Sequence, residues 1–214
     1  MSGTRNNAAA SPAHRATLWW AGVGLAAGGL LWQPLLAFEN LADLHDRSTT
    51  WQWYLDQWGF LVAMTLLLVG LVALDRARVT GEGRVGRGAM HVLVFAWGVL
   101  VLGQLVKLTL GWDLAVVGIV GGLLTYPSAL VAGFAILRSG RWAGWRRWTL
   151  LGEGVYETLV ILVPLLVANW GPSWATEAGW QLSWVIVGAA ALTEARNSER
   201  LAPAEHAGPR MMTT

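Results

Sequence analysis

Two glutamates, Glu153 and Glu157, lie four residues apart in an otherwise apolar stretch of the chain, next to Tyr156. In a helix this spacing places both carboxyl groups on one face. A charged side chain at the centre of a bilayer costs roughly 2.5 to 3.5 kcal/mol on insertion scales, and two carboxylates this close in a medium of low dielectric constant would not both stay ionised. The pair therefore suits a general acid, a proton relay or a cation site.

A purely structural role for the same pair stays open. Glu153 could pair with Arg146 or Arg147 near the membrane surface, and Glu157 could be protonated or bonded to His91 at a similar depth. His91 is the histidine that falls within a predicted span, and one histidine with two glutamates at these spacings is no metal signature. We predict no metal and no cofactor.

Tryptophan is the second residue type that could serve a ligand, since the chain contains 15 of them. Most fall near the ends of apolar stretches, where the indole ring sits in lipid and its N–H reaches water. Four lie deeper: Trp32, Trp97, Trp180 and Trp184. Trp180 and Trp184 share a helix face, and such an aromatic wall can hold a cationic or carbocationic ligand by cation–π attraction. Ordinary helix packing is the alternative.

Six apolar stretches must position these residues. Each is about as long as a helix needs to cross a hydrocarbon core of roughly 30 Å. They cover residues 17–38, 58–74, 88–110, 114–137, 148–169 and 174–193. A helix satisfies its backbone hydrogen bonds internally, which lipid demands. The sequence therefore predicts an all-α fold, a polytopic membrane helix bundle of six transmembrane helices.

The composition excludes several classes of protein. With 55% hydrophobic and 13% charged residues, the chain carries about half the charge of a soluble domain. This excludes disorder and a coiled coil and argues against a soluble enzyme. The lack of cysteine excludes disulfides, thiol catalysis and thiolate-bound metals. Although the net charge is +2, the basic residues sit in short loops and not along one face, so we expect no nucleic-acid partner.

The basic residues also predict the orientation. With six spans, all of the 15 Lys and Arg residues except Arg47 and Lys107 would lie on one side of the membrane. The positive-inside rule places that side in the cytoplasm. We therefore predict a multi-pass protein of the cell (plasma) membrane with both termini cytoplasmic. Its transmembrane domain covers residues 17–194, between mobile tails at residues 1–16 and 195–214.

Small residues and a proline predict how the helices pack. Gly24 with Gly28, and Gly118 with Gly122, are pairs that let two helices approach closely, so we expect tight contacts inside the bundle. Pro127 lies near mid-membrane and removes one helical hydrogen bond, which favours a kink. The segment 81–86 has the glycines of a phosphate-binding loop but lacks the preceding strand, and we expect a turn-rich cytoplasmic connection.

Three functions fit these residues. The first is a membrane protein that binds or transports a small apolar or cationic ligand within the bundle. Beside the glutamate pair, its ligand-binding residues would be Trp97, Trp180, Trp184, Tyr156 and His91. The second is an intramembrane enzyme acting on a lipid or isoprenoid, for example a cyclase, with Glu153 or Glu157 as the general acid. The third is an accessory subunit that packs against a membrane protein partner. The sequence does not decide whether the protein is an enzyme.

Overall fold

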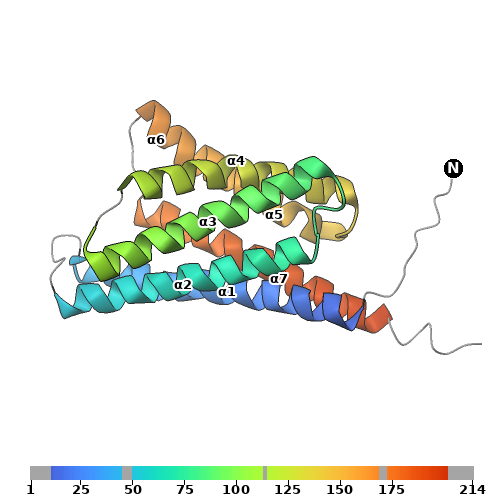
Figure 1. The fold of residues 1–214 in the computed structure, drawn as a ribbon, viewed down its shortest axis with the longest axis horizontal. Helices are drawn as coiled ribbons and strands as arrows, with labels where there is room; N and C mark the ends of the chain where they lie inside the picture. The colour runs from blue at the N-terminus through green and yellow to red at the C-terminus, as the bar shows by residue number, and fades with distance from the viewer. Residues whose placement is uncertain (1–10, 45–49, 113–114, 169–172, 202–214) are drawn as a thin grey trace, which may run out of the picture.

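A computed structural model shows the arrangement of the chain and describes residues 11–44, 50–112, 115–168 and 173–201. Every regular element in these ranges is helical, so the all-α prediction is confirmed (Figure 1). Of the predicted tails, residues 1–10 and 202–214 lie outside the described residues. The elements are α1 (Pro12–Leu41), α2 (Trp51–Arg76), α3 (Arg84–Leu110), α4 (Ala115–Ser139), η2 (Gly144–Trp148), α5 (Thr149–Tyr156), η3 (Glu157–Leu162), α6 (Val163–Ala168) and α7 (Trp174–Leu201).

The first two helices begin earlier than hydropathy predicts because capping side chains set their ends. Before Pro12, the hydroxyl of Ser11 accepts a backbone N–H from the first turn of α1 at 3.2 Å. Proline suits this first helical position because its missing N–H would have no partner there. Before Trp51, the hydroxyl of Thr50 accepts a backbone N–H from the first turn of α2 at 3.3 Å. Both starts are therefore encoded by local chemistry outside the apolar stretches.

Five helical stretches of the described residues are long and apolar enough to cross a membrane: α1, α2, α3, most of α4, and the continuous run from η2 to α6. By length and composition, these five stretches are candidate membrane-spanning helices. α7 has 28 residues but is less apolar than the other long helices and does not belong to this set. It carries Glu177 near its start and Glu194 and Arg196 near its end.

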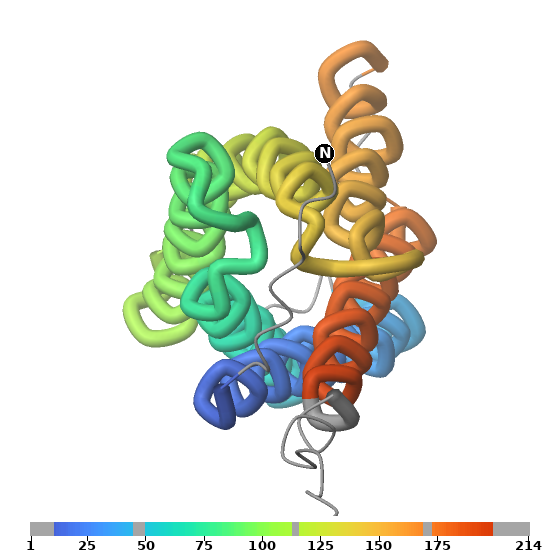
Figure 2. The backbone as a smooth tube through the Cα atoms, turned by 90° about the vertical axis from the view of Figure 1, so that its right-hand side faces the viewer, coloured from blue at the N-terminus to red at the C-terminus, as the bar shows by residue number. Residues whose placement is uncertain are grey.

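The long helices form a closed ring when the bundle is viewed along its length (Figure 2). α1 packs against α2 and α7, α3 packs against α2 and α4, and α5 packs against α4 and α7. Successive long helices run in opposite directions, so the start of α1 and the end of α7 lie at the same end of the molecule (Figure 1). This arginine-rich end carries Arg15, Arg76, Arg78, Arg84, Arg87, Arg138, Arg141, Arg146, Arg147 and Arg196.

Glycines bring α1 very close to α2, as predicted for Gly24 and Gly28. A Cβ on Gly24 would lie 2.8 Å from the backbone nitrogen of Gly70, closer than side chains approach in real structures. Such contacts hold helices together in lipid, where the hydrophobic effect drives no association between them. The prediction of a tight contact is wrong for Gly118 and Gly122. Among the described residues, a Cβ on Gly118 would meet nothing within 4 Å, and a Cβ on Gly122 would meet only a side chain of its own helix.

Pro127 leaves α4 unbroken in the described residues from Ala115 to Ser139. The hydroxyl of Ser128 donates to the carbonyl of Leu124 at 2.6 Å and lies 2.9 Å from that of Thr125. The N–H that Pro127 lacks would bond the carbonyl of Leu123, whereas Ser128 serves two carbonyls that follow it. The polar side chains around Pro127 thus serve the backbone of α4.

A second proline, Pro164, follows a turn of π-helix. In η3 the N–H of Val163 donates to the carbonyl of Thr158, five residues back instead of four. The missing N–H of proline interrupts the helical bond pattern, and here a wider turn precedes this interruption. The π-helix begins at Glu157 and therefore sets the position of that carboxyl group.

Candidate functional site

Glu153 and Glu157 lie inside the ring, on the run formed by α5 and η3, and are 1% and 0% exposed. Both carboxyl groups accept the same N–H. Nε1 of Trp180 on α7 lies 3.0 Å from Oε1 of Glu153 and 2.6 Å from Oε1 of Glu157. The two carboxyl groups lie side by side because they are four residues apart on one helical run. Both also bind the same N–H from α7, away from water.

The two carboxyl groups are not equivalent. The second oxygen of Glu153 accepts a hydrogen bond from the hydroxyl of Ser183, which lies one helical turn after Trp180. The second oxygen of Glu157 has no hydrogen-bond partner in the described part of the chain. Glu153 thus has a protein donor on each oxygen, whereas the second oxygen of Glu157 has no donor in the described chain.

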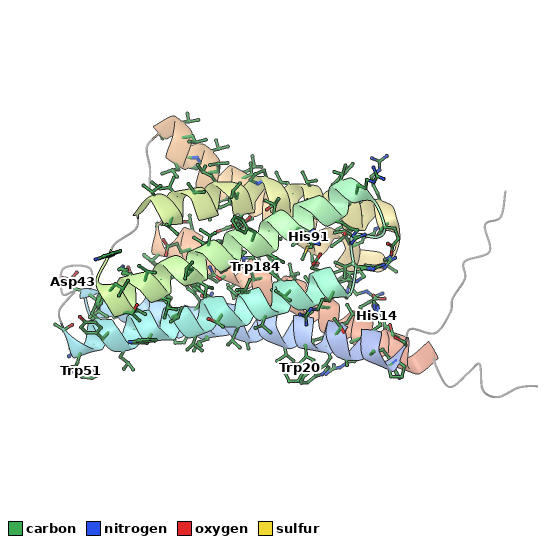
Figure 3. All side chains as sticks on the ribbon, viewed as in Figure 1. His14, Trp20, Asp43, Trp51, His91 and Trp184 are labelled. Atoms are coloured by element: carbon green, nitrogen blue, oxygen red, sulfur yellow. The ribbon has the colours of Figure 1, made fainter. Side chains whose placement is uncertain are left out.

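An aromatic cluster, formed by Trp32, Phe60, Trp97, Trp180 and Trp184, packs beside the carboxyl groups. Trp97 lies at its centre, with its ring centroid 6.0 Å from that of Trp180 and 5.8 Å from that of Trp184. The ring of Trp32 lies 6.4 Å from Trp180 and 5.0 Å from Phe60. Figure 3 places Trp184 near the middle of the bundle. The four deep tryptophans, which come from three different helices, therefore meet inside the ring.

Several polar atoms of this centre are buried without a hydrogen-bond partner in the described chain. They are Nε1 of Trp32, Trp97 and Trp184, Oε2 of Glu157, and both side-chain polar atoms of Gln181. Leaving a buried donor or acceptor unpaired costs roughly 1 to 3 kcal/mol, so proteins keep few such groups outside functional sites. Such groups need a partner that the described chain does not supply, for example an ordered water or a ligand.

Two predicted site residues lie outside this centre. Tyr156 faces the start of α7, where its hydroxyl donates to the carbonyl of Thr176 at 2.9 Å. Figure 3 labels His91 on α3. Its side chain is largely exposed, and its Nε2 lies 3.4 Å from Oδ2 of Asp75. The structure therefore pairs His91 with Asp75 and does not bring it to Glu157.

The arginines that could have neutralised Glu153 have other partners. Nε of Arg146 lies 3.1 Å from a carboxylate oxygen of Glu194 near the end of α7. The guanidinium of Arg147 stacks over the ring of Trp148, 5.5 Å from its centroid. Within the described chain, neither arginine forms an ion pair with Glu153. The hydrogen bonds to this carboxyl group come from uncharged donors.

A second group of buried polar side chains, which sequence reasoning missed, lies next to the aromatic cluster on the side away from the arginine-rich end. Asp56 on α2 is fully buried, and its Oδ2 accepts a hydrogen bond from Nε2 of Gln57 at 3.3 Å. Nε2 of Gln104 on α3 donates to Oε1 of Gln57 at 3.0 Å. Asp56 precedes Phe60 of the cluster by one helical turn. That spacing of four residues was the one signal that could have placed Asp56 inside the ring.

One place inside the ring holds two carboxyl groups, several aromatic faces, and unpaired donors and acceptors. All of these groups are shielded from water there. Such an arrangement can bind a positive charge or exchange a proton. In the described ranges, no three His, Asp or Glu side chains come together to hold a metal ion. Comparison of the chain with protein-family models, with curated proteins and with solved structures gives no match.

Proposed function

We propose that the protein binds a small cation at the centre of the helix ring and moves it across the membrane, with Glu153 and Glu157 as the counter-charge. The observation that carries this proposal is the pair of buried carboxyl groups that share the single indole N–H of Trp180. A carboxylate removed from water is costly unless a positive charge or a proton compensates it. Because neither glutamate forms an ion pair with an arginine or lysine of the described chain, a bound cation or a proton must do so.

The pair couples the cation to a proton. Two neighbouring carboxyl groups in an interior of low dielectric constant do not both ionise, so the site without a cation holds at least one proton. A cation that arrives supplies the compensating charge and lets the site release this proton. Exchange of one proton for one cation keeps the charge of the interior unchanged, which avoids the cost of an uncompensated charge in lipid.

The aromatic cluster favours an organic cation over a hydrated metal ion. A desolvated cation gains roughly 2 kcal/mol or more over the face of an indole ring. The unpaired Nε1 atoms of Trp97 and Trp184 can donate hydrogen bonds to a hydroxyl or carbonyl oxygen of the same ligand. A small ammonium compound between the carboxyl pair and these rings would use both attractions.

Asp56, with Gln57 and Gln104, supports access from the end of the bundle opposite the arginines. These buried side chains lie one helical turn from Phe60 of the aromatic cluster. A carboxylate on one side of the site and arginines on the other create a potential that draws cations in from the carboxylate side. We therefore propose that the cation reaches the glutamate pair past Asp56.

We further propose that the chain crosses the membrane six times, with α7 as the sixth span. Its 28 residues give a length of about 42 Å at 1.5 Å per residue. α7 packs against α1 and α5 and supplies Trp180, Gln181 and Trp184 to the interior, which accounts for its lower hydropathy. The arginine-rich end collects the basic residues of successive connections, and the positive-inside rule assigns that end, with both termini, to the cytoplasmic side of the cell membrane.

Reporter fusions test this topology. A reporter active only in the cytoplasm is expected to be active when fused either before Met1 or after Thr214. The same reporter inserted between α1 and α2 is expected to be inactive, because that connection lies at the opposite end of the bundle. Opposite results from the two termini would exclude an even number of crossings.

Calorimetric titration of the purified protein tests cation binding. We expect benzyltrimethylammonium to bind and its uncharged carbon isostere, neopentylbenzene, to bind far more weakly, because the carboxyl pair attracts only the charged compound. Titrations in two buffers of different ionisation enthalpy are expected to report the release of about one proton per bound cation, and the affinity should rise with pH. Equal binding of the two compounds, or binding without proton release, would contradict the proposal.

A further inference from the structure

A groove of about 500 Å³ opens at the arginine-rich end of the bundle, between α3 and α4. Its walls are the connection 80–83, the first turn of α3 and the last turns of α4. The volume lies within the range of small-molecule sites, roughly 300 to 1,000 Å³. The groove includes most of the glycine-rich segment 81–86, which has no part in the proposed cation site.

The helical wall of this groove is apolar and exposed. Val85 on α3 is 75% exposed, and Val131 and Phe134 on α4 are 42% and 50% exposed. Apolar side chains this exposed on membrane-spanning helices face the acyl chains of the bilayer. One side of the groove is therefore suited to hydrocarbon.

The end of the groove near the α2–α3 connection carries a surplus of positive charge. Arg141 and Arg78 both bind Glu82, at 3.1 Å and 3.3 Å. Arg78 in particular lowers the pKa of Glu82, so this carboxylate stays ionised and neutralises one of the two arginines. Arg138 forms no ion pair in the described chain, and its guanidinium lies 5.5 Å from the ring centroid of Phe134. Its charge is thus available to an anion.

The backbone adds further donors for an anion. Gly81 has a φ of +81°, a conformation that glycine adopts readily, and α3 then begins after Gly83 without a side chain that caps it. The N–H groups of the first turn of α3 are left for another acceptor, and the helix dipole favours a negative one. These donors and Arg138 line the same groove.

We propose that this groove binds one phospholipid with an anionic headgroup. Its phosphate lies between Arg138 and the first turn of α3, and an acyl chain follows the apolar wall formed by Val85, Val131 and Phe134. Basic pockets between transmembrane helices recognise anionic lipids in this way. The site is separate from the proposed cation site and does not depend on it.

Native mass spectrometry of the purified full-length protein tests the proposal with phosphatidylglycerol and phosphatidylcholine of identical acyl chains. We expect tighter binding of phosphatidylglycerol, and Arg138→Gln should weaken it roughly fivefold, the factor for one basic residue at a membrane surface. Arg147→Gln is the matched control. Arg147 is exposed at the same end and stacks on the ring of Trp148 at 5.5 Å, as Arg138 does on Phe134, but it lies outside the groove.

Three outcomes would overturn the proposal. Equal binding of the two lipids by the wild-type protein would remove the headgroup preference. Equal losses in the Arg138 and Arg147 variants would indicate general attraction to a basic surface. If soluble glycerol phosphate competes at the same concentration as the lipid, the groove binds a free phosphate compound and not a phospholipid. Arg138→Lys keeps the charge and is expected to retain most of the preference for phosphatidylglycerol. If it loses that preference, the effect of Arg138→Gln comes from a change in the fold and not from the lost charge.

Discussion

Glu157→Gln is expected to weaken binding of benzyltrimethylammonium at least roughly thirtyfold and to abolish the proton release that accompanies it. The substitution keeps an oxygen that can accept the N–H of Trp180, but it removes the charge and the oxygen that has no partner in the described chain. Removal of one member of a buried charge pair costs roughly 2 to 5 kcal/mol, and 2 kcal/mol corresponds to about a thirtyfold change in affinity. Calorimetric titration measures both effects.

Glu82→Gln is the matched control for this experiment. It makes the same chemical change at an exposed carboxylate of the α2–α3 connection, where Arg78 and Arg141 are the partners. The variant is expected to bind the cation as the wild-type protein does. Wild-type affinity in a folded Glu157→Gln variant would mean that the pair is not the counter-charge and that Glu157 only joins η3 to α7.

The second large effect is expected from Gly154→Ala, which should lower the free energy of unfolding by about 1 to 3 kcal/mol. Gly154 follows Glu153 directly, at a close contact between α5 and α4. A Cβ on Gly154 would lie 2.8 Å from the carbonyl carbon of Ala129 and from Cα of Leu130, so α5 must move away from α4. Because this shift also moves Glu153 relative to Trp180, cation binding is expected to weaken as well.

Gly152→Ala, two residues earlier on the same helix, should have the opposite effect. A Cβ on Gly152 would meet nothing within 4 Å. The added methyl group then causes no collision and removes the entropic disadvantage of glycine in a helix, so stabilisation by up to about 1 kcal/mol is expected. Unfolding of both variants in mixed detergent micelles, followed by circular dichroism, measures the difference. Equal effects would show that helix propensity, and not the contact between α4 and α5, dominates at both positions.

The sequence by itself determined the local features of this protein. The length of the apolar stretches predicted the helices, although capping by Ser11 and Thr50 moved the first two starts outward. The spacing of four residues predicted that Glu153 and Glu157 share a face, and depth along the apolar stretches singled out the tryptophans that form the cluster. These features depend only on neighbours within one helix, and helical periodicity encodes such neighbours.

Only the tertiary structure decided which face of each helix lies inside the ring. In lipid the outer face of a helix is as apolar as its packed face, so the pattern that orients a helix in a soluble protein carries little information here. The sequence therefore did not show that His91 turns outward to Asp75, that Asp56 is buried beside Gln57, or that Gly118 has open space around it.

The partners of the glutamate pair also depended on the tertiary structure. Trp180 and Ser183 reach the two carboxyl groups because α7 packs against α5 and closes the ring. A single indole N–H shared by two carboxyl groups requires accurate placement of both helices. Gly154 sets the approach of α5 to α4, and the hydrogen bond from Tyr156 to the carbonyl of Thr176 joins α5 to the start of α7. Contacts between distant segments of the chain set this geometry, and no pattern within one helix encodes them.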